Sequence, residues 1–130
     1  MTKINRLLTN ICSNKLAESR DFYTNLFDFI VDFDSDWFIH LISKDEQLEL
    51  GIIEQKNDIV PKESQQEPQC MYLTFVVNSA DELYETAKEF NYQIIQKPHD
   101  TSYGQRRLLI KDPNGLVVDI SSPIPNFKFE

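Results

Sequence analysis

In the first half of the chain some segments have the apolar pattern of a strand and one has the apolar spacing of a helix. Residues 7–12 form a short apolar run typical of a strand, and the polar pair Ser13-Asn14 after it supplies helix-cap chemistry. From Leu16 to about Phe27 the apolar residues recur at helical spacing, and Asp28 ends this predicted helix. Three further runs, rich in β-branched and aromatic residues, predict strands: residues 29–33, 37–42 and 47–53.

The same order of elements begins again after a polar segment. Residues 56–69 carry two prolines among Glu, Gln, Lys and Ser, with little periodic hydrophobicity, and we interpret them as a linker. Residues 71–77 then predict a strand. Ser79 with Glu82 is typical of a capping box, and Asn91 ends the helix in the left-handed conformation that we also expect at Asp28. Strands follow at residues 92–96, 106–111 and 116–121, the last two joined by the turn Asp112-Pro113-Asn114-Gly115.

Both halves therefore predict a strand, a helix and three strands. We expect an α+β protein with a single domain over residues 1–130, made of one module over 4–55, the linker over 56–69 and a second module over 70–123. Aligning Thr9 with Thr74 brings the two predicted helix ends within two positions of register. Element order alone would also suit a ferredoxin-like fold or a plain α+β sheet.

The composition of the chain limits the kinds of partner and the location that we expect. The net charge of −8 repels phosphate backbones, so we expect no nucleic-acid partner and a mild preference for cationic ligands. No apolar run approaches the roughly 20 residues that span a bilayer, and we expect a cytoplasmic protein without a membrane segment. The two cysteines, Cys12 and Cys70, fit neither a disulfide framework nor a zinc spacing, and we interpret them as small buried residues.

Two segments resemble a known family. Ser19, Phe22 and Tyr23 match a Ser-x-x-Phe-Tyr helix motif, although Phe27-Asp28 replaces its usual Leu-Gly ending. Tyr103-Gly104 followed by the turn at residues 112–115 and by Asp119 is similar to a closing hairpin. In this order, over residues 7–123, these motifs resemble the glyoxalase/bleomycin-resistance/dioxygenase superfamily, also called the vicinal oxygen chelate superfamily. The resemblance implies two βαβββ modules forming an open barrel-like cleft, and a homodimer.

The resemblance also implies where metal-dependent members hold their ion. Those positions fall on Leu7 or Leu8, on Glu49, on Tyr72 and on Asp119. Leucine cannot ligate and neutral tyrosine is a poor ligand for the usual divalent ions. We therefore expect that the protein binds no metal and no other cofactor. If a metal is bound, we expect Glu49 and Asp119 to be its ligands. Neither histidine of the chain aligns with a ligand position.

The remaining candidates would line a binding cleft. Glu49 and Asp119 are each flanked by apolar strand residues, so both carboxylates lie on the opposite face of the strand from their neighbours. If that face lines the cleft, the carboxylates would bind a cation or act as a base. The alternative is that the face is exposed to solvent. Arg106 and Arg107 face opposite ways, and at most one enters the cleft. Aromatic residues can form a groove for a flat ligand or can fill the core. The full candidate set is Trp37, Phe38, His40, Glu49, Tyr72, Tyr103, Arg106 and Asp119.

The function we expect is metal-free binding of a small cationic or aromatic molecule in a dimer cleft, as in antibiotic sequestration. The alternative is a metal-dependent lyase or dioxygenase of the same superfamily, acting on a small carbonyl or aromatic substrate. A metal-free enzyme with Glu49 or Asp119 as base is a further alternative, as is a regulatory module for a partner protein. No glycine-rich phosphate loop and no nucleophile motif occurs in the sequence.

Overall fold

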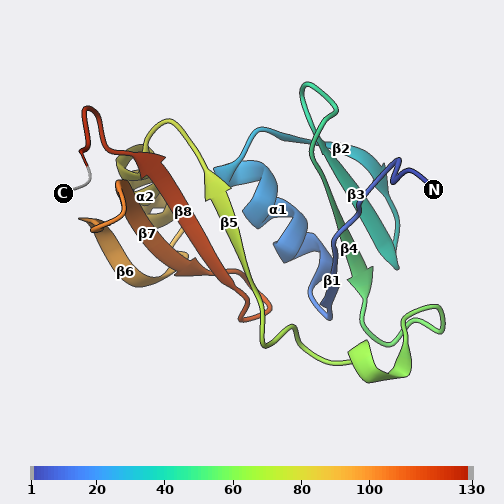
Figure 1. Ribbon diagram of the computed structural model, residues 1–130. Helices are drawn as coiled ribbons and strands as arrows, with labels where there is room; N and C mark the ends of the chain where they lie inside the picture. Colours follow the sequence, from blue (N-terminus) through green and yellow to red (C-terminus); the bar gives the residue numbers. More distant parts are fainter. Residues whose placement is uncertain (1, 129–130) are drawn as a thin grey trace. The chain divides into compact units, whose positions relative to one another are not determined.

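A computed structural model describes residues 2–128 of the chain (Figure 1). It divides into two compact units, Met1–Pro68 and Gln69–Glu130. Each unit contains one four-stranded mixed sheet and one α-helix, in the order strand, helix and three strands. The predicted α+β class with a repeated βαβββ module is therefore confirmed, and neither sheet is closed.

The first unit has the sheet order β1-β4-β3-β2. Its elements are β1 (Asn10–Ser13), α1 (Leu16–Leu26), β2 (Phe29–Asp34), β3 (Phe38–Ser43) and β4 (Glu49–Glu54). The central strand β4 is parallel to β1 and antiparallel to β3. Alternate residues of the two central strands, such as Leu41 and Ile52, are fully buried, as are Phe22 and Tyr23 of α1. Since α1 contacts β3 and β4, one face of this sheet packs under the helix and the intervening residues lie on the other face.

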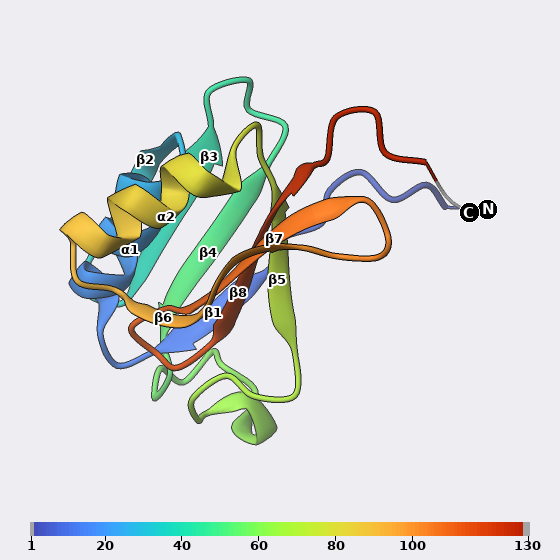
Figure 2. The same cartoon turned by 90° about the vertical axis from the view of Figure 1, so that its left-hand side faces the viewer.

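The second unit repeats this arrangement with the sheet order β5-β8-β7-β6. Its elements are β5 (Tyr72–Val76), α2 (Ala80–Glu89), β6 (Gln93–Asp100), β7 (Gln105–Lys111) and β8 (Val117–Pro123). Figure 2 shows α2 on one side of this sheet. The buried residues of its core are Ala80, Ala87, Leu108, Ile110, Leu116, Val118 and Ile120.

Local signals of the second unit act as predicted. Ser79 is the N-cap of α2, and its hydroxyl accepts a hydrogen bond from the backbone N–H of Glu82 at 3.1 Å. Asn91 ends the helix with a left-handed φ of 58°. In the β7–β8 turn, Asp112 Oδ1 accepts the backbone N–H groups of Asn114 and Leu116 at 2.8 and 2.9 Å, and Gly115 supplies a φ of 83°.

The first unit departs from the predicted boundaries. The N-cap of α1 is Lys15, without a side-chain capping bond, and the Ser13 hydroxyl instead accepts the N–H of Lys15 at 2.8 Å. Asp28 has no left-handed φ, because the chain leaves α1 through an extended Phe27 with φ −124°. The first strand begins at Asn10 rather than at residue 7, since its pairing with β4 begins there.

The predicted linker between the two repeats has some regular structure of its own. It contains η1 (Lys62–Ser64), a single turn of 3₁₀ helix, and Val60 there is buried. The prediction of two buried cysteines is also wrong: both are free thiols, Cys12 half-buried and Cys70 exposed. No helix within residues 2–128 is long and apolar enough to cross a membrane.

Candidate functional site

Four charged side chains meet on the face of the first sheet opposite α1. Arg6 binds both oxygens of Glu49, with Nε 2.7 Å from Oε2 and Nη2 2.6 Å from Oε1. His40 Nε2 lies 2.8 Å from the same Oε1, and His40 Nδ1 lies 2.9 Å from Oδ2 of Asp32. A bidentate guanidinium–carboxylate pair and an imidazole between two carboxylates thus share Glu49. We call these four residues the charged cluster.

Strand geometry sets the positions of the cluster. His40 of β3 is paired with Gly51 of β4, two residues from Glu49, so the His40 and Glu49 side chains approach diagonally on one face. The β2–β3 register shifts between Val31 and Phe33, and this bulge leaves Asp32 as the extra residue beside His40. Arg6 arrives from the segment that precedes β1.

The neighbouring charges in the cluster shift the pKa values of His40 and Glu49. The hydrogen bond with Asp32, followed by that with Glu49, raises the pKa of His40 above its ordinary value near 6.5. The Arg6 hydrogen bonds, followed by that of His40, lower the pKa of Glu49 to about 2. With a carboxylate at each ring nitrogen, the doubly protonated imidazolium donates to both, and Glu49 stays ionised at neutral pH. Arg6 Nη2 also lies 3.3 Å from His40 Nε2, so the two cations share Oε1 of Glu49.

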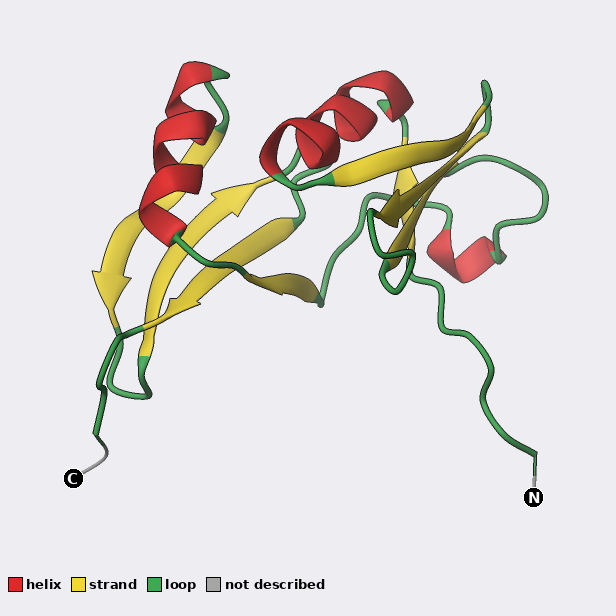
Figure 3. Cartoon of the chain, turned by 90° about the horizontal axis from the view of Figure 1, so that it is seen from above, coloured by secondary structure: helices red, strands yellow, loops and turns green. Residues whose placement is uncertain are grey.

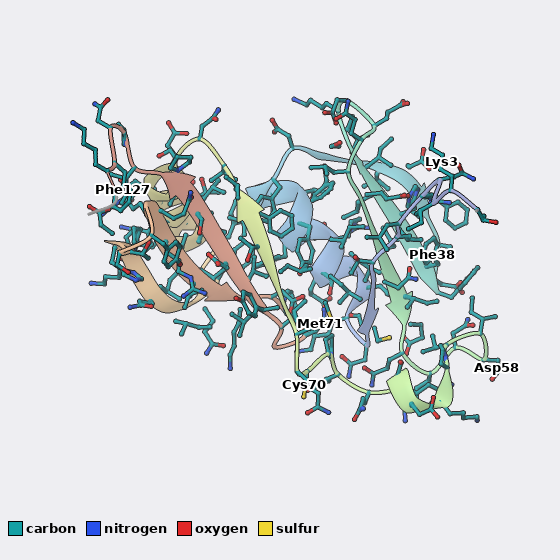
Figure 4. All side chains as sticks on the ribbon, viewed as in Figure 1. Lys3, Phe38, Asp58, Cys70, Met71 and Phe127 are labelled. Carbon is teal, nitrogen blue, oxygen red and sulfur yellow. The ribbon has the colours of Figure 1, made fainter. Side chains whose placement is uncertain are left out.

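Aromatic rings continue this face beyond His40. The ring of Phe38 stacks against the imidazole of His40 at a centroid distance of 6.4 Å and an interplanar angle of 13°. Trp37 and Phe33 flank Phe38 at 5.6 and 6.3 Å. Phe33 is 48% and Trp37 38% exposed, so both rings offer a surface to solvent. Phe38 is labelled in Figure 4, on the first sheet. We call Phe33, Trp37 and Phe38 the aromatic group.

The second unit carries a more buried polar group around Asp119. Asp119 is 5% exposed and accepts hydrogen bonds from the hydroxyls of Thr74 at 3.2 Å and Ser121 at 2.8 Å. Arg107 Nε lies 3.2 Å from Asp119 Oδ2 as an ion pair. This contact lacks hydrogen-bond geometry, since the buried Nε of Arg107 makes no hydrogen bond in the described part of the chain.

The two carboxylates occupy equivalent positions of the repeat. Arg107 of β7 is paired with Ser121, two residues from Asp119, as His40 of β3 is paired with the residue two positions from Glu49. Both units therefore place a basic side chain diagonally opposite a carboxylate of the central strand. Thr74 of β5 is level with Asp119. Continuing the β1–β4 register back by two residues brings Leu8 level with Glu49.

The eight residues predicted as candidates fall into separate places. Trp37, Phe38, His40 and Glu49 lie together in the first unit, and Asp119 has its own neighbours in the second. Tyr72 and Tyr103 are 56% and 50% exposed. Arg106 pairs with Asp81 of α2 and with Asp100 of β6, whereas the adjacent Arg107 pairs with Asp119.

The residues at the family's metal positions do not fit a metal. In the first unit Leu8 has no donor atom, and a guanidinium already holds both oxygens of Glu49. In the second unit the register puts Thr74, rather than the predicted Tyr72, level with Asp119, and a neutral hydroxyl is a weak ligand. Within residues 2–128 no group of three or more His, Cys, Asp or Glu side chains is arranged to hold an ion.

Sequence reasoning missed Arg6 and Asp32. Asp32 gives a usable signal, because it is a single carboxylate inside the apolar run at residues 29–33. Arg6 lies two residues before Leu8, and alternation from the ligand position would have placed it on the same face. Its partner can only be identified once β1 and β4 are known to be neighbours.

The duplicated βαβββ architecture, with equivalent carboxylates in its two central strands, places the protein in a class of two-module α+β folds. The sequence model of the glyoxalase/bleomycin resistance protein/dioxygenase superfamily matches residues 3–120. The chain belongs to this superfamily. No curated protein matches the chain in sequence.

Solved structures share the fold at low sequence identity. A hypothetical protein from S. aureus is 23% identical with a TM-score of 0.75, covering 93% of this chain and 95% of its own. A family enzyme from Burkholderia phytofirmans PsJN is 20% identical with a TM-score of 0.76, covering 90% of this chain and 97% of its own. The fosfomycin resistance protein FosX from Listeria monocytogenes is 16% identical with a TM-score of 0.66, covering 96% of each chain. These similarities concern the fold.

Proposed function

We propose that this protein binds a small, flat aromatic cation on the aromatic group of its first unit, without a metal and without transforming the ligand. The observation that carries the proposal is the interleaving of acidic and aromatic residues at residues 32–38, Asp-Phe-Asp-Ser-Asp-Trp-Phe. Phe33 and Trp37 are exposed there, and so is Asp36 between them.

Two attractions act together at such a surface. A flat ring gains contact area and offset stacking on Trp37 and Phe33. A positive charge on the ligand is attracted by the faces of those rings and by the carboxylate of Asp36. The other two carboxylates of the segment are already paired, one with His40 and one with Arg20. The net charge of −8 also favours the approach of a cation over that of an anion.

The charged cluster argues against base catalysis. A general base works best when its pKa lies near the working pH. Arg6 and His40 lower the pKa of Glu49 to about 2, so its carboxylate holds a proton poorly at neutral pH. Asp119 is buried against Arg107 and two hydroxyls. Binding alone is therefore the function we propose, and a drug of this chemistry would be withheld from its target by it.

Calorimetry with a matched pair of ligands tests the proposal. We expect 1-methylquinolinium to bind with one-to-one stoichiometry and neutral quinoline to bind more weakly at pH 7.5. Trp37 is the only tryptophan, so its fluorescence change on titration reports this site. A saturable change distinguishes binding from collisional quenching.

Two exposed phenylalanines provide a variant and its control. Phe33→Ala removes a ring that is 48% exposed in the aromatic group, and Phe90→Ala removes one that is 47% exposed in the second unit. We expect about a tenfold loss of affinity for the first, as for the loss of one stacked, cation-binding ring, and none for the second. Equal losses, or equal binding of the two ligands, would overturn the proposal.

The expected homodimer is a separate matter from this site. All residues of the aromatic group and of the charged cluster belong to one unit of one chain. Sedimentation of the purified protein with and without 1-methylquinolinium would show whether the protein dimerises and whether the ligand changes its state.

A further inference from the structure

We propose that Arg6 is an internal occupant of a guanidinium-binding position at Glu49, and that the ligand of this face carries a guanidinium or amidinium group that displaces it. This inference rests on the proposed function and names the chemical class of its ligand. It also assigns to Arg6 the role of an intramolecular competitor.

The two partners are held very differently. Glu49 begins β4, its side chain is 17% exposed, and His40 fixes one of its oxygens at 2.8 Å. Arg6 is 59% exposed and lies in the segment before β1, where residues 2–7 are all exposed. Figure 3 shows this N-terminal segment leaving the first sheet on the side away from α1. The carboxylate is therefore the fixed receptor, and the arginine is the part that can leave.

The donor geometry selects a planar cation. Arg6 uses Nε for one oxygen and Nη2 for the other, at 2.7 and 2.6 Å. A guanidinium or amidinium presents two parallel N–H donors and can reproduce both bonds. An ammonium is a point charge without this fork, so it replaces the pair less well.

The aromatic group lies within reach of this position. Glu49 contacts His40, and His40 stacks on Phe38 at 6.4 Å. Gly51 lies opposite His40 on the same face, where an added Cβ would stand 3.1 Å from Phe38 Cε1 and would clash with the Asn10 side chain. The Asn10 side chain and Phe38 therefore fill the space above Gly51, and a flat ligand with its cation at Glu49 would lie over His40 to reach Phe38.

Benzamidine, a planar phenyl amidinium, is the probe, and its affinity is measured by calorimetry at pH 7.5. Arg6→Ala removes the competitor, and we expect it to tighten benzamidine binding about two- to fivefold, because an exposed ion pair of this kind contributes modestly. Lys3→Ala removes the same charge from the same segment and serves as the matched control, with an expected change below that of Arg6→Ala. Glu49→Gln should abolish the gain in the double variant. Benzylamine, an ammonium, should gain less than benzamidine from Arg6→Ala.

The outcomes separate this inference from the proposed function. If 1-methylquinolinium binds but Arg6→Ala leaves benzamidine affinity unchanged, weakens it or matches Lys3→Ala, the competitor role is overturned and the aromatic site stands. If no aromatic cation binds the natural chain or Arg6→Ala, both are overturned. Should Arg6→Ala fold poorly, Arg6→Lys keeps the charge and removes the fork, and an increase in benzamidine affinity there supports the proposal whereas no increase overturns it.

Discussion

His40 Nε2 lies 2.8 Å from Oε1 of Glu49 although the two residues are not level in the sheet. The β3–β4 register pairs His40 with Gly51, and the diagonal approach across a glycine brings the imidazole to the carboxylate. The second unit builds the same diagonal with Arg107 and Asp119. The repeat has therefore kept one geometric relationship and given it a titratable base in one unit and a permanent cation in the other.

The first prediction concerns the pH dependence of stability through His40. Its pKa is raised in the folded state, so its contribution to the free energy of unfolding is fully present below the unfolded pKa of about 6.5. That contribution is lost as the pH rises through the folded pKa. The stability difference between the natural chain and His40→Gln should therefore shrink between pH 6 and pH 9 in denaturant unfolding. A difference that grows with pH would contradict it.

Asp32→Asn tests the cause of that shift. The hydrogen bond with Asp32 is its largest contribution, so this variant should bring the pKa of His40 down toward its ordinary value. Proton NMR of the imidazole C–H signals measures it directly, and His99→Gln assigns the two histidines. An unchanged pKa would mean that the bulge does not hold Asp32 against His40 in solution.

The second prediction concerns Glu49 in acid. Its pKa is lowered to about 2, so its stabilising contribution is present above the unfolded pKa of about 4.3 and is lost as the pH falls toward 2. Because Arg6 is the largest cause, Arg6→Ala should raise the pKa of Glu49. Carbon NMR of the side-chain carboxyl follows the titration, and Lys3→Ala should leave it nearly unchanged. Equal shifts in the two variants would assign the effect to general charge rather than to the bidentate pair.

The third prediction concerns the cap of α2. Ser79→Ala removes the hydroxyl that accepts the Glu82 N–H, and we expect the free energy of unfolding to fall by about 1 kcal/mol. Ser102→Ala, in the exposed turn before β7, should change it by less than about 0.5 kcal/mol. Thermal or denaturant unfolding measures both. A null result at Ser79 would show that the N–H groups of this helix end are satisfied by water.

Sequence could predict those parts of the fold that depend on neighbours along the chain. Ser79, Asn91 and the turn from Asp112 to Gly115 behave as predicted because a cap or turn is decided within about four residues. The prediction that a left-handed Asp28 ends α1 was wrong, because an extended Phe27 leads directly into β2. The conformation of this connection depends on tertiary packing, and the neighbouring residues in the sequence do not indicate it.

The candidate site could be predicted only in part. The fold resemblance located Glu49 and Asp119 on the central strands. Their partners depend on register: the bulge in β2 brings Asp32 to His40, and the β1–β4 pairing brings Arg6 to Glu49. A shift of one residue reverses the face of every side chain in a strand, which is why the sequence left open whether Arg106 or Arg107 faces the cleft; in the structure Arg107 pairs with Asp119.

The fourth prediction concerns thiol reactivity. Cys70 is exposed, whereas burial raises the pKa of the half-buried Cys12 and lowers its thiolate fraction. Iodoacetamide at pH 7.5 should therefore alkylate Cys70 well before Cys12. Mass spectrometry of timed digests measures the two rates, and Cys70→Ser should abolish the fast phase. A fast phase that persists in this variant would show that Cys12 is more accessible than its burial indicates.

The fifth prediction compares two adjacent arginines. Arg107→Met leaves the carboxylate of Asp119 buried without its cation, and we expect a loss of about 1–3 kcal/mol in the free energy of unfolding. Arg106→Met removes two surface ion pairs, with Asp81 and Asp100, and should cost less than about 1 kcal/mol.

A double-mutant cycle decides whether Arg107 acts through Asp119. If the two charges are coupled, Arg107→Met combined with Asp119→Asn should cost less than the sum of the single changes, because the second change removes the uncompensated carboxylate. Additive losses would mean that the aliphatic stem of Arg107 contributes packing rather than charge. Since Thr74 and Ser121 still bond Asp119 in the arginine variant, the cycle isolates the cation from the hydroxyls. Coupling here and at His40–Glu49 would show that the repeated diagonal stabilises both sheets, whereas coupling in the first unit alone would show that it stabilises only the first sheet.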